Sequence, residues 1–89
     1  LDDLQAAVLA VKLAHLDAWN ARRTAQARRY DEALAGSGLV PPHVPAWAEP
    51  AWHLYVVRVP GGAPAREALQ RRLAADGVGT LIHYPIPPH

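Results

Sequence analysis

The stretch "LDDLQAAVLAVKLAHLDAWNARRTAQARRYDEALAG", residues 1–36, sets the fold class, because its pattern predicts a long amphipathic helix. Apolar side chains recur at the three- and four-residue spacing that puts them on one helix face. This stripe comprises Leu4, Ala7, Val8, Val11, His15 and Leu16, and continues with some drift through Trp19, Ala27, Tyr30 and Leu34. Asp2 or Asp3 is expected to cap the start of the helix. Gly36 and Gly38 are expected to end it.

The length of this helix limits how the chain can fold. If it is unbroken, about 33 residues at ~1.5 Å each make a rod of roughly 50 Å. A helix that long, in a chain of 89 residues, cannot cover its own apolar stripe. The stripe shifts near residues 15–17, which allows a break in the helix there as the alternative to one unbroken rod.

The rest of the chain predicts a linker and then a strand–helix–strand unit. Residues 37–51 contain four prolines and form an extended linker. "WHLYVVRV", residues 52–59, is rich in β-branched and aromatic residues and predicts a strand. A turn then leads to a helix over residues 64–77, which Gly77 ends. "VGTLIHY", residues 78–84, predicts a second strand that Pro85 ends. The predicted fold class is therefore α+β.

Composition excludes several classes of protein. Cysteine is absent, so the chain offers neither a disulfide nor a thiolate metal site. The formal net charge of +1 gives no general attraction to nucleic acid or membranes. No apolar run is long enough to span a bilayer, and Leu1-Asp2-Asp3 is not a signal peptide, so a cytoplasmic protein is expected. Since the chain lacks an initiating methionine, we expect an internal part of a longer protein; the alternative is a trimmed protein.

Several possible sites have simpler structural interpretations. The five histidines lack zinc-binding spacing, including the pair His83 and His89, so no metal site is expected. The arginines of the long helix, at 22, 23, 28 and 29, are interrupted by acidic residues and predict a solvated face. Lys12, the sole lysine, is expected at the edge of the apolar stripe and not as a Schiff-base nucleophile. His53 is expected to be a hydrogen-bonded structural residue. Trp47 and Trp52 are expected to anchor the linker.

His83, Tyr84 and Pro85 form the strongest candidate site. They lie where the second predicted strand ends, and ligands often bind beside strand ends in domains that contain sheets. An imidazole and a phenol there can hydrogen-bond a polar substrate or an anion. Pro85 and Pro87 would hold the backbone rigid. From the residues alone, a simple structural turn is an equally good interpretation.

Linked motifs along the whole chain resemble one known family. "LDDLQAAVL", residues 1–9, is similar to the R-L-D-E-x-Q-A-A-x-L pattern of the DegT/DnrJ/EryC1/StrS family of pyridoxal-phosphate-dependent sugar aminotransferases. The next helical motif is matched by Lys12-Leu13, Leu16-Asp17, Trp19-Asn20, Arg22-Arg23, Ala27, Tyr30 and Leu34. The remaining motifs are matched by "HLYVVR" at 53–58, "REAL" at 66–69 and "GVGTLIHYPIPPH" at 77–89, with valine for isoleucine at 78.

The resemblance implies a fold and an activity. It implies the C-terminal part of a fold type I enzyme, with residues 1–36 linking the large and small domains, 37–51 as linker, and 52–89 in the small domain. The implied enzyme uses pyridoxal 5'-phosphate to aminate a nucleotide-linked keto-deoxysugar, takes the amine from glutamate and forms a homodimer. The resemblance implies that His83, Tyr84 and Pro85 contact the substrate, and the sugar-3-amino branch is the first expectation. The cofactor lysine of the family has no match in this chain, so these residues alone are expected to be inactive.

Two other functions fit parts of the pattern. A non-catalytic helical interaction domain would use the apolar stripe to dock a partner. A basic helical nucleic-acid binder would use the four arginines, but the helix lacks a row of aromatic residues for base stacking. The 89 residues are expected to be partly ordered and prone to aggregation when isolated, because nothing covers the stripe.

Overall fold

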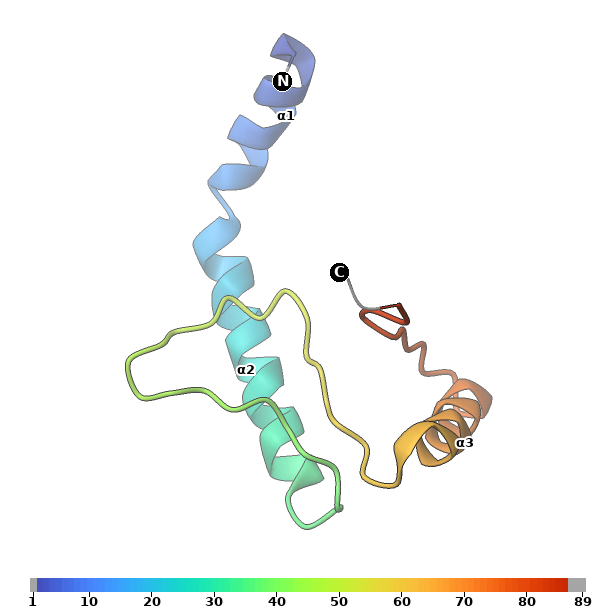
Figure 1. Ribbon diagram of the computed structural model, residues 1–89. Helices are drawn as coiled ribbons and strands as arrows, with labels where there is room; N and C mark the ends of the chain where they lie inside the picture. Colours follow the sequence, from blue (N-terminus) through green and yellow to red (C-terminus); the bar gives the residue numbers. More distant parts are fainter. Residues whose placement is uncertain (1, 87–89) are drawn as a thin grey trace. The chain divides into compact units, whose positions relative to one another are not determined.

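The computed structural model describes residues 2–86, and three helices account for its regular structure (Figure 1). Helix α1 spans Asp3–Leu13, α2 spans Leu16–Leu34 and α3 spans Gly62–Ala75. The chain divides into two compact units, Leu1–Arg58 and Val59–His89. The first unit holds α1 and α2, and the second holds α3. The long helix of the first third is therefore present, but in two parts.

The break between α1 and α2 falls at Ala14 and His15, close to the predicted position. There the His15 amide donates to the carbonyl of Lys12, three residues earlier, at 2.9 Å. Regular helical hydrogen bonding begins again where the Trp19 amide donates to the His15 carbonyl. The His15 and Trp19 rings stack with their centroids 5.7 Å apart. At the other end of α1, Asp2 Oδ1 accepts a hydrogen bond from the Gln5 amide at 2.8 Å, which confirms an aspartate cap.

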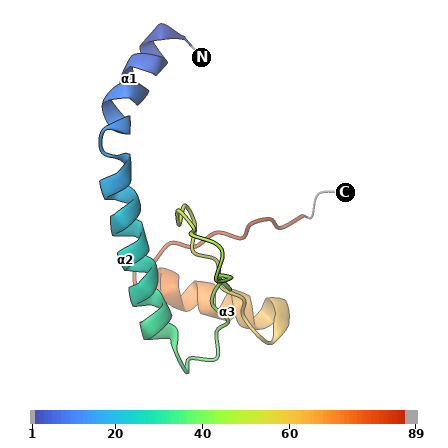
Figure 2. The ribbon, with the colours of Figure 1, turned by 90° about the vertical axis from the view of Figure 1, so that its left-hand side faces the viewer.

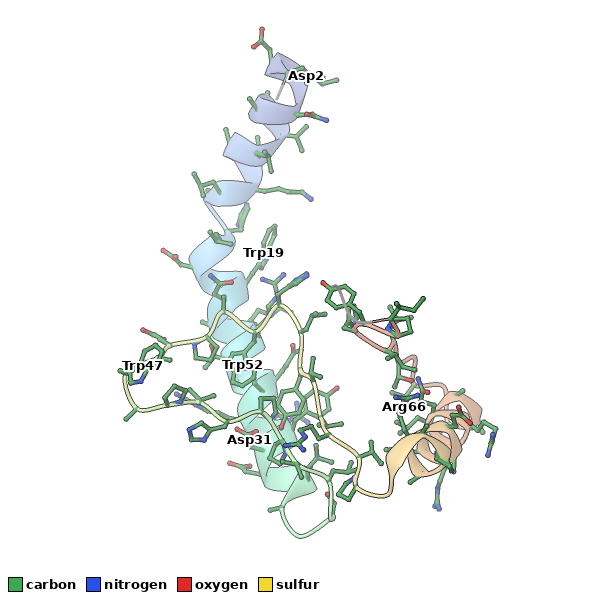
Figure 3. All side chains as sticks on the ribbon, viewed as in Figure 1. Asp2, Trp19, Asp31, Trp47, Trp52 and Arg66 are labelled. Carbon is green, nitrogen blue, oxygen red and sulfur yellow. The ribbon has the colours of Figure 1, made fainter. Side chains whose placement is uncertain are left out.

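An aromatic cluster holds the extended chain of the first unit against α2. Tyr55 stacks on Tyr30 of α2, with centroids 5.0 Å apart, and lies 5.6 Å from the ring of Trp52. The Tyr55 hydroxyl also donates to Asp31 Oδ1 at 2.6 Å. Trp52 has a φ of 56°, which is uncommon for a large side chain and is held here by the ring contact. Figure 3 labels Asp31 and Trp52 in this region. These four residues tie residues 52–55 to α2.

The predicted strand–helix–strand unit is not shown, because residues 2–86 form no strand. The strand expected over 52–59 is reduced to one antiparallel bridge between Val40 and Arg58. Their amides and carbonyls exchange two hydrogen bonds, of 3.0 and 2.9 Å. Residues 78–84, expected as a second strand, also lie outside regular structure. A strand forms only where a neighbouring strand satisfies its backbone groups, and the described residues supply just the single bridge.

The predicted helix of the second half is confirmed as α3, which begins two residues earlier than expected. Gly77, with a φ of 82°, follows its last turn. The Gly77 amide donates to the Ala74 carbonyl at 3.0 Å, and the Val78 amide to the Leu73 carbonyl at 2.8 Å. This pair of bonds is the Schellman arrangement, which needs a left-handed residue that glycine adopts without strain. The motif turns the chain back, so residues 78–86 run beside α3 (Figures 1 and 2).

The hydrogen bond to Asp31 makes Tyr55 a reporter of the first unit. Burial of the phenol, then the bond to Asp31 and its negative charge, raise the pKa of Tyr55 from 10.0 to about 12. Between pH 10.0 and about 12, Tyr55 keeps its proton in the folded state but loses it in the unfolded state. The free energy of unfolding should therefore fall as the pH rises through this range.

We therefore expect the Tyr55 phenol to ionise at a higher pH than an ordinary tyrosine. The measurement is an alkaline titration followed by ultraviolet absorbance, in which the curve of Tyr55→Phe is subtracted from that of the unsubstituted protein. The Asp31→Asn variant keeps an acceptor but removes the charge, and should lower the pKa of Tyr55. If Tyr55 ionises at 10.0 in the folded parent protein, the Asp31 contact is not formed in solution.

Candidate functional site

The candidate site residues lie together on the segment that follows α3. His83, Tyr84 and Pro85 are all exposed, and the His83 and Tyr84 rings meet edge to face with centroids 5.7 Å apart. The peptide bond between these two residues is cis. Upstream, Gln70 Nε2 of α3 donates to Thr80 Oγ1 at 3.2 Å and fixes the start of the segment against the helix. Of the predicted loop, Pro87 lies outside the described residues.

The exposed rings give this segment its chemistry. The imidazole of His83 offers at least one N–H donor, and the Tyr84 hydroxyl both donates and accepts. Tyr84 is 74% exposed, so its hydroxyl is free to contact a bound molecule. A sugar hydroxyl or a phosphate oxygen is a suitable partner for both groups. The segment can therefore bind a polar ligand through these two neighbouring side chains.

The face of α3 that packs toward this segment contains a residue that the sequence did not single out. Arg66 is half-buried, and its Nε is shielded from solvent with no hydrogen-bond partner among residues 2–86. Figure 3 labels Arg66 between α3 and the returning segment. The sequence signal was the motif that begins at Arg66, which marked a helix start and gave no role to the guanidinium.

The other sequence candidates are not brought together into a site. Lys12 is exposed on α1, and the arginines of α2, at 22, 23, 28 and 29, are exposed as predicted. Within the described part of the chain, no group of three or more histidine, aspartate and glutamate residues could hold a metal ion. His89 lies outside that part. No described helix is long and apolar enough to cross a membrane.

Two expectations about the linker and the first predicted strand are wrong. Trp47 was expected to anchor the linker, but it is 88% exposed on the loop, where Figure 3 labels it. Trp52 alone packs, against Tyr55. His53 was expected inside a strand as a hydrogen-bonded residue, but it lies exposed at a bend.

The family of the chain follows from comparison with known sequences. The profile of the DegT/DnrJ/EryC1/StrS aminotransferase family matches residues 1–89. The chain belongs to this family. The match confirms the resemblance drawn from the motifs and assigns the chain to a family of fold type I aminotransferases.

Two of three curated relatives that this chain matches are named as transaminases. The chain is 53% identical over 90 residues to "Erythromycin biosynthesis sensory transduction protein EryC1" of Saccharopolyspora erythraea. It is 47% identical over 90 residues to "dTDP-3-amino-3,4,6-trideoxy-alpha-D-glucose transaminase" of Streptomyces venezuelae. It is 47% identical over 89 residues to "dTDP-3-amino-3,6-dideoxy-alpha-D-galactopyranose transaminase" of Aneurinibacillus thermoaerophilus. Each match covers 100% of this chain but 23–24% of the relative. No solved structure matches it.

The chain spans about a quarter of the length of these relatives. The residues that the structure describes, 2–86, do not fit a cradle for pyridoxal 5'-phosphate. Lys12 is its sole amine side chain, and it lies exposed on α1 among Val8, Leu9 and Val11, with no hydroxyl or guanidinium group beside it on the helix to hold a phosphate. No catalytic residue of the chain is therefore identified, and the segment with His83 remains its candidate for contacting a substrate.

Proposed function

We propose that this chain is the C-terminal part of a pyridoxal-phosphate-dependent aminotransferase that converts a nucleotide-linked keto-deoxysugar to an amino sugar. The carrying observation is the match of one aminotransferase family over residues 1–89, together with two relatives named as dTDP-amino-sugar transaminases. In the proposed reaction the sugar carbonyl becomes a carbon bearing an amine. The amino donor, proposed to be glutamate, loses its amine and becomes a 2-oxo acid.

The proposed parent enzyme binds the cofactor with residues outside this chain. The poor fit of Lys12 supports this division, because an exposed helix offers neither a pocket nor a phosphate cradle. The enzyme is further proposed to be a cytoplasmic homodimer. Residues 1–36 link its large and small domains, 37–51 form the linker, and 52–89 belong to the small domain.

The small domain is proposed to complete a sheet in the parent enzyme. Residues 52–59 and 78–84 have strand composition, but among the described residues only Arg58 has a bridge partner. Strands from the rest of the polypeptide would satisfy their free amides and carbonyls. The strand–helix–strand unit would then form around α3.

The substrate contact is proposed for His83, with Tyr84 and Pro85 beside it. The exposure of these residues supports this role, as does the hydrogen bond from Gln70 to Thr80, which holds the start of their segment. A donor that is already positioned loses less entropy when it binds the sugar or its diphosphate.

The proposal predicts two properties of the full-length parent protein. Purified from cells, it should show the near-visible absorbance of bound pyridoxal 5'-phosphate. It should also form 2-oxoglutarate from glutamate beyond one equivalent per active site only when a dTDP-linked keto-deoxysugar is present to accept the amine. If the parent protein binds the cofactor but does not aminate sugar nucleotides, the proposed substrate class is wrong. An open reading frame that starts immediately before Leu1 and lacks any upstream lysine motif would refute the enzyme and favour an interaction domain.

A further inference from the structure

Helix α1 is apolar on almost every side. With successive residues about 100° apart around the axis, Leu4, Val8 and Val11 form one line along the helix. Leu9 and Leu13 form a second line on the opposite side. A third side carries alanines at positions 6, 7 and 10, with Asp3 at its N-terminal end. The other two polar residues of α1, Gln5 and Lys12, share one narrow strip between the two lines.

Both apolar lines are open in this structure. Leu4 and Val11 are 76% and 70% exposed on the first line, and Leu13 is 67% exposed on the second. Figures 1 and 2 show no other segment of the first unit beside α1. A helix that is apolar all round is typical of a protein interior or a membrane span. No described helix is long and apolar enough to cross a membrane. An interior position is therefore the physical solution for α1.

The distribution of apolar residues indicates what covers the helix. A second copy of the chain, paired about a twofold axis through α1, would cover one side and leave the opposite line exposed. The alanine side, by contrast, allows a neighbouring backbone to approach closely, so three sides of α1 can be in contact at once. Only a folded body that surrounds the helix satisfies this pattern. About three quarters of each curated relative lies outside the match, which is enough chain to form such a body.

We propose that α1 is an interior helix of the parent enzyme, enclosed on both apolar lines by the part of the same polypeptide that lies outside residues 1–89. The strip of Gln5 and Lys12 is the side that stays in contact with water. This inference rests on the proposed function, because it takes the chain to be part of a longer aminotransferase. It goes beyond that function by assigning the occupant of each face of α1.

Thiol labelling of the full-length parent protein tests the enclosure. Since residues 1–89 contain no cysteine, single cysteines can be placed on α1 in a parent background whose other reactive cysteines are replaced. Val8→Cys probes the first line, Leu9→Cys the second, and Gln5→Cys the polar strip. We expect Val8→Cys and Leu9→Cys to react with a maleimide at least about 100-fold more slowly than Gln5→Cys, and all three to react alike in denaturant.

Three results would overturn the proposal. One is a reaction of Val8→Cys or Leu9→Cys with the maleimide that is as fast as that of Gln5→Cys. Another is protection of all three positions alike. The third is protection that is lost when the protein is diluted to monomer, which would assign the cover to a second copy. If a cysteine variant does not fold, hydrogen exchange of the α1 amides in the unmodified parent tests enclosure of the helix as a whole, and rapid exchange along all of α1 would overturn the proposal. Labelling does not depend on cofactor absorbance or on transamination. An α1 that is protected in a protein without transaminase activity would contradict the proposed function alone, and an unprotected α1 in an active transaminase would contradict the enclosure alone.

Discussion

Replacing Tyr55 with alanine is expected to speed hydrogen exchange at the Val40 and Arg58 amides about 100-fold in the parent protein. These amides form the bridge that closes the loop of the first unit. The stacking of Tyr55 on Tyr30 and its contact with Trp52 hold the bridge close to α2. Two ring contacts contribute about 0.5–1.5 kcal/mol each. The hydrogen bond to the Asp31 carboxylate is exposed to solvent, which lowers its contribution to about 1 kcal/mol, so the sum is about 3 kcal/mol.

Two variants separate the parts of this effect. Tyr55→Phe keeps both ring contacts and removes only the hydrogen bond to Asp31, so exchange should rise about fivefold to tenfold. Tyr84→Ala removes an equally large ring that is 74% exposed in the other unit, and should leave the bridge amides unchanged. Exchange is measured by mass spectrometry on peptides that cover residues 37–58. If Tyr55→Ala exchanges no faster than Tyr55→Phe, the ring contacts do not stabilise the loop.

The helices could be predicted from sequence because their signals are local. The spacing of apolar residues, the cap at Asp2 and the left-handed position at Gly77 all act within one or two turns. The position of the turn at Ala14 and His15 could also be inferred from sequence, because the apolar stripe shifts there. These features depend on residues that are close together in the chain.

The strands were not formed because their formation depends on distant residues. Residues 52–59 have the composition of a strand, yet a strand needs a partner for its amides and carbonyls. Within residues 2–86, Val40 alone supplies one, to Arg58. Trp47 shows the same limit, because its side chain has no surface to pack on and is exposed. The contact of Tyr55 with Tyr30 and Asp31 joins residues about 24 positions apart, and no local pattern indicated it.

The candidate site was found through motif order and not through geometry. His83 and Tyr84 gain their meaning from the family pattern, and the structure adds their exposure and their edge-to-face contact. Arg66 was not predicted as a notable side chain, since the shielding of its Nε depends on packing. A single sequence indicates which residues belong to a motif, but it does not show which atoms of those residues are left without partners.

His83→Ala is expected to lower kcat/KM for the sugar nucleotide by about 10- to 100-fold in the parent enzyme. The variant removes an N–H donor, and a hydrogen bond to a sugar hydroxyl or a charged diphosphate is worth about 1.5–3 kcal/mol when one partner is charged. The effect should appear with the sugar nucleotide and not with the amino donor, because the donor acid lacks the groups that His83 is proposed to contact. Initial rates at varied concentrations of each substrate separate the two.

Two further variants make this test specific to the position of the imidazole. His53→Ala removes another exposed histidine, outside the segment of residues 78–86. It should leave kcat/KM unchanged for both the sugar nucleotide and the amino donor. His83→Asn keeps an N–H donor on a shorter side chain and should recover part of the loss, whereas a residue needed only for folding would show no such rescue. Because His83 is exposed, its replacement should not alter the melting temperature. Unchanged kcat/KM for the sugar nucleotide in His83→Ala, with normal cofactor absorbance, would remove His83 from the substrate site.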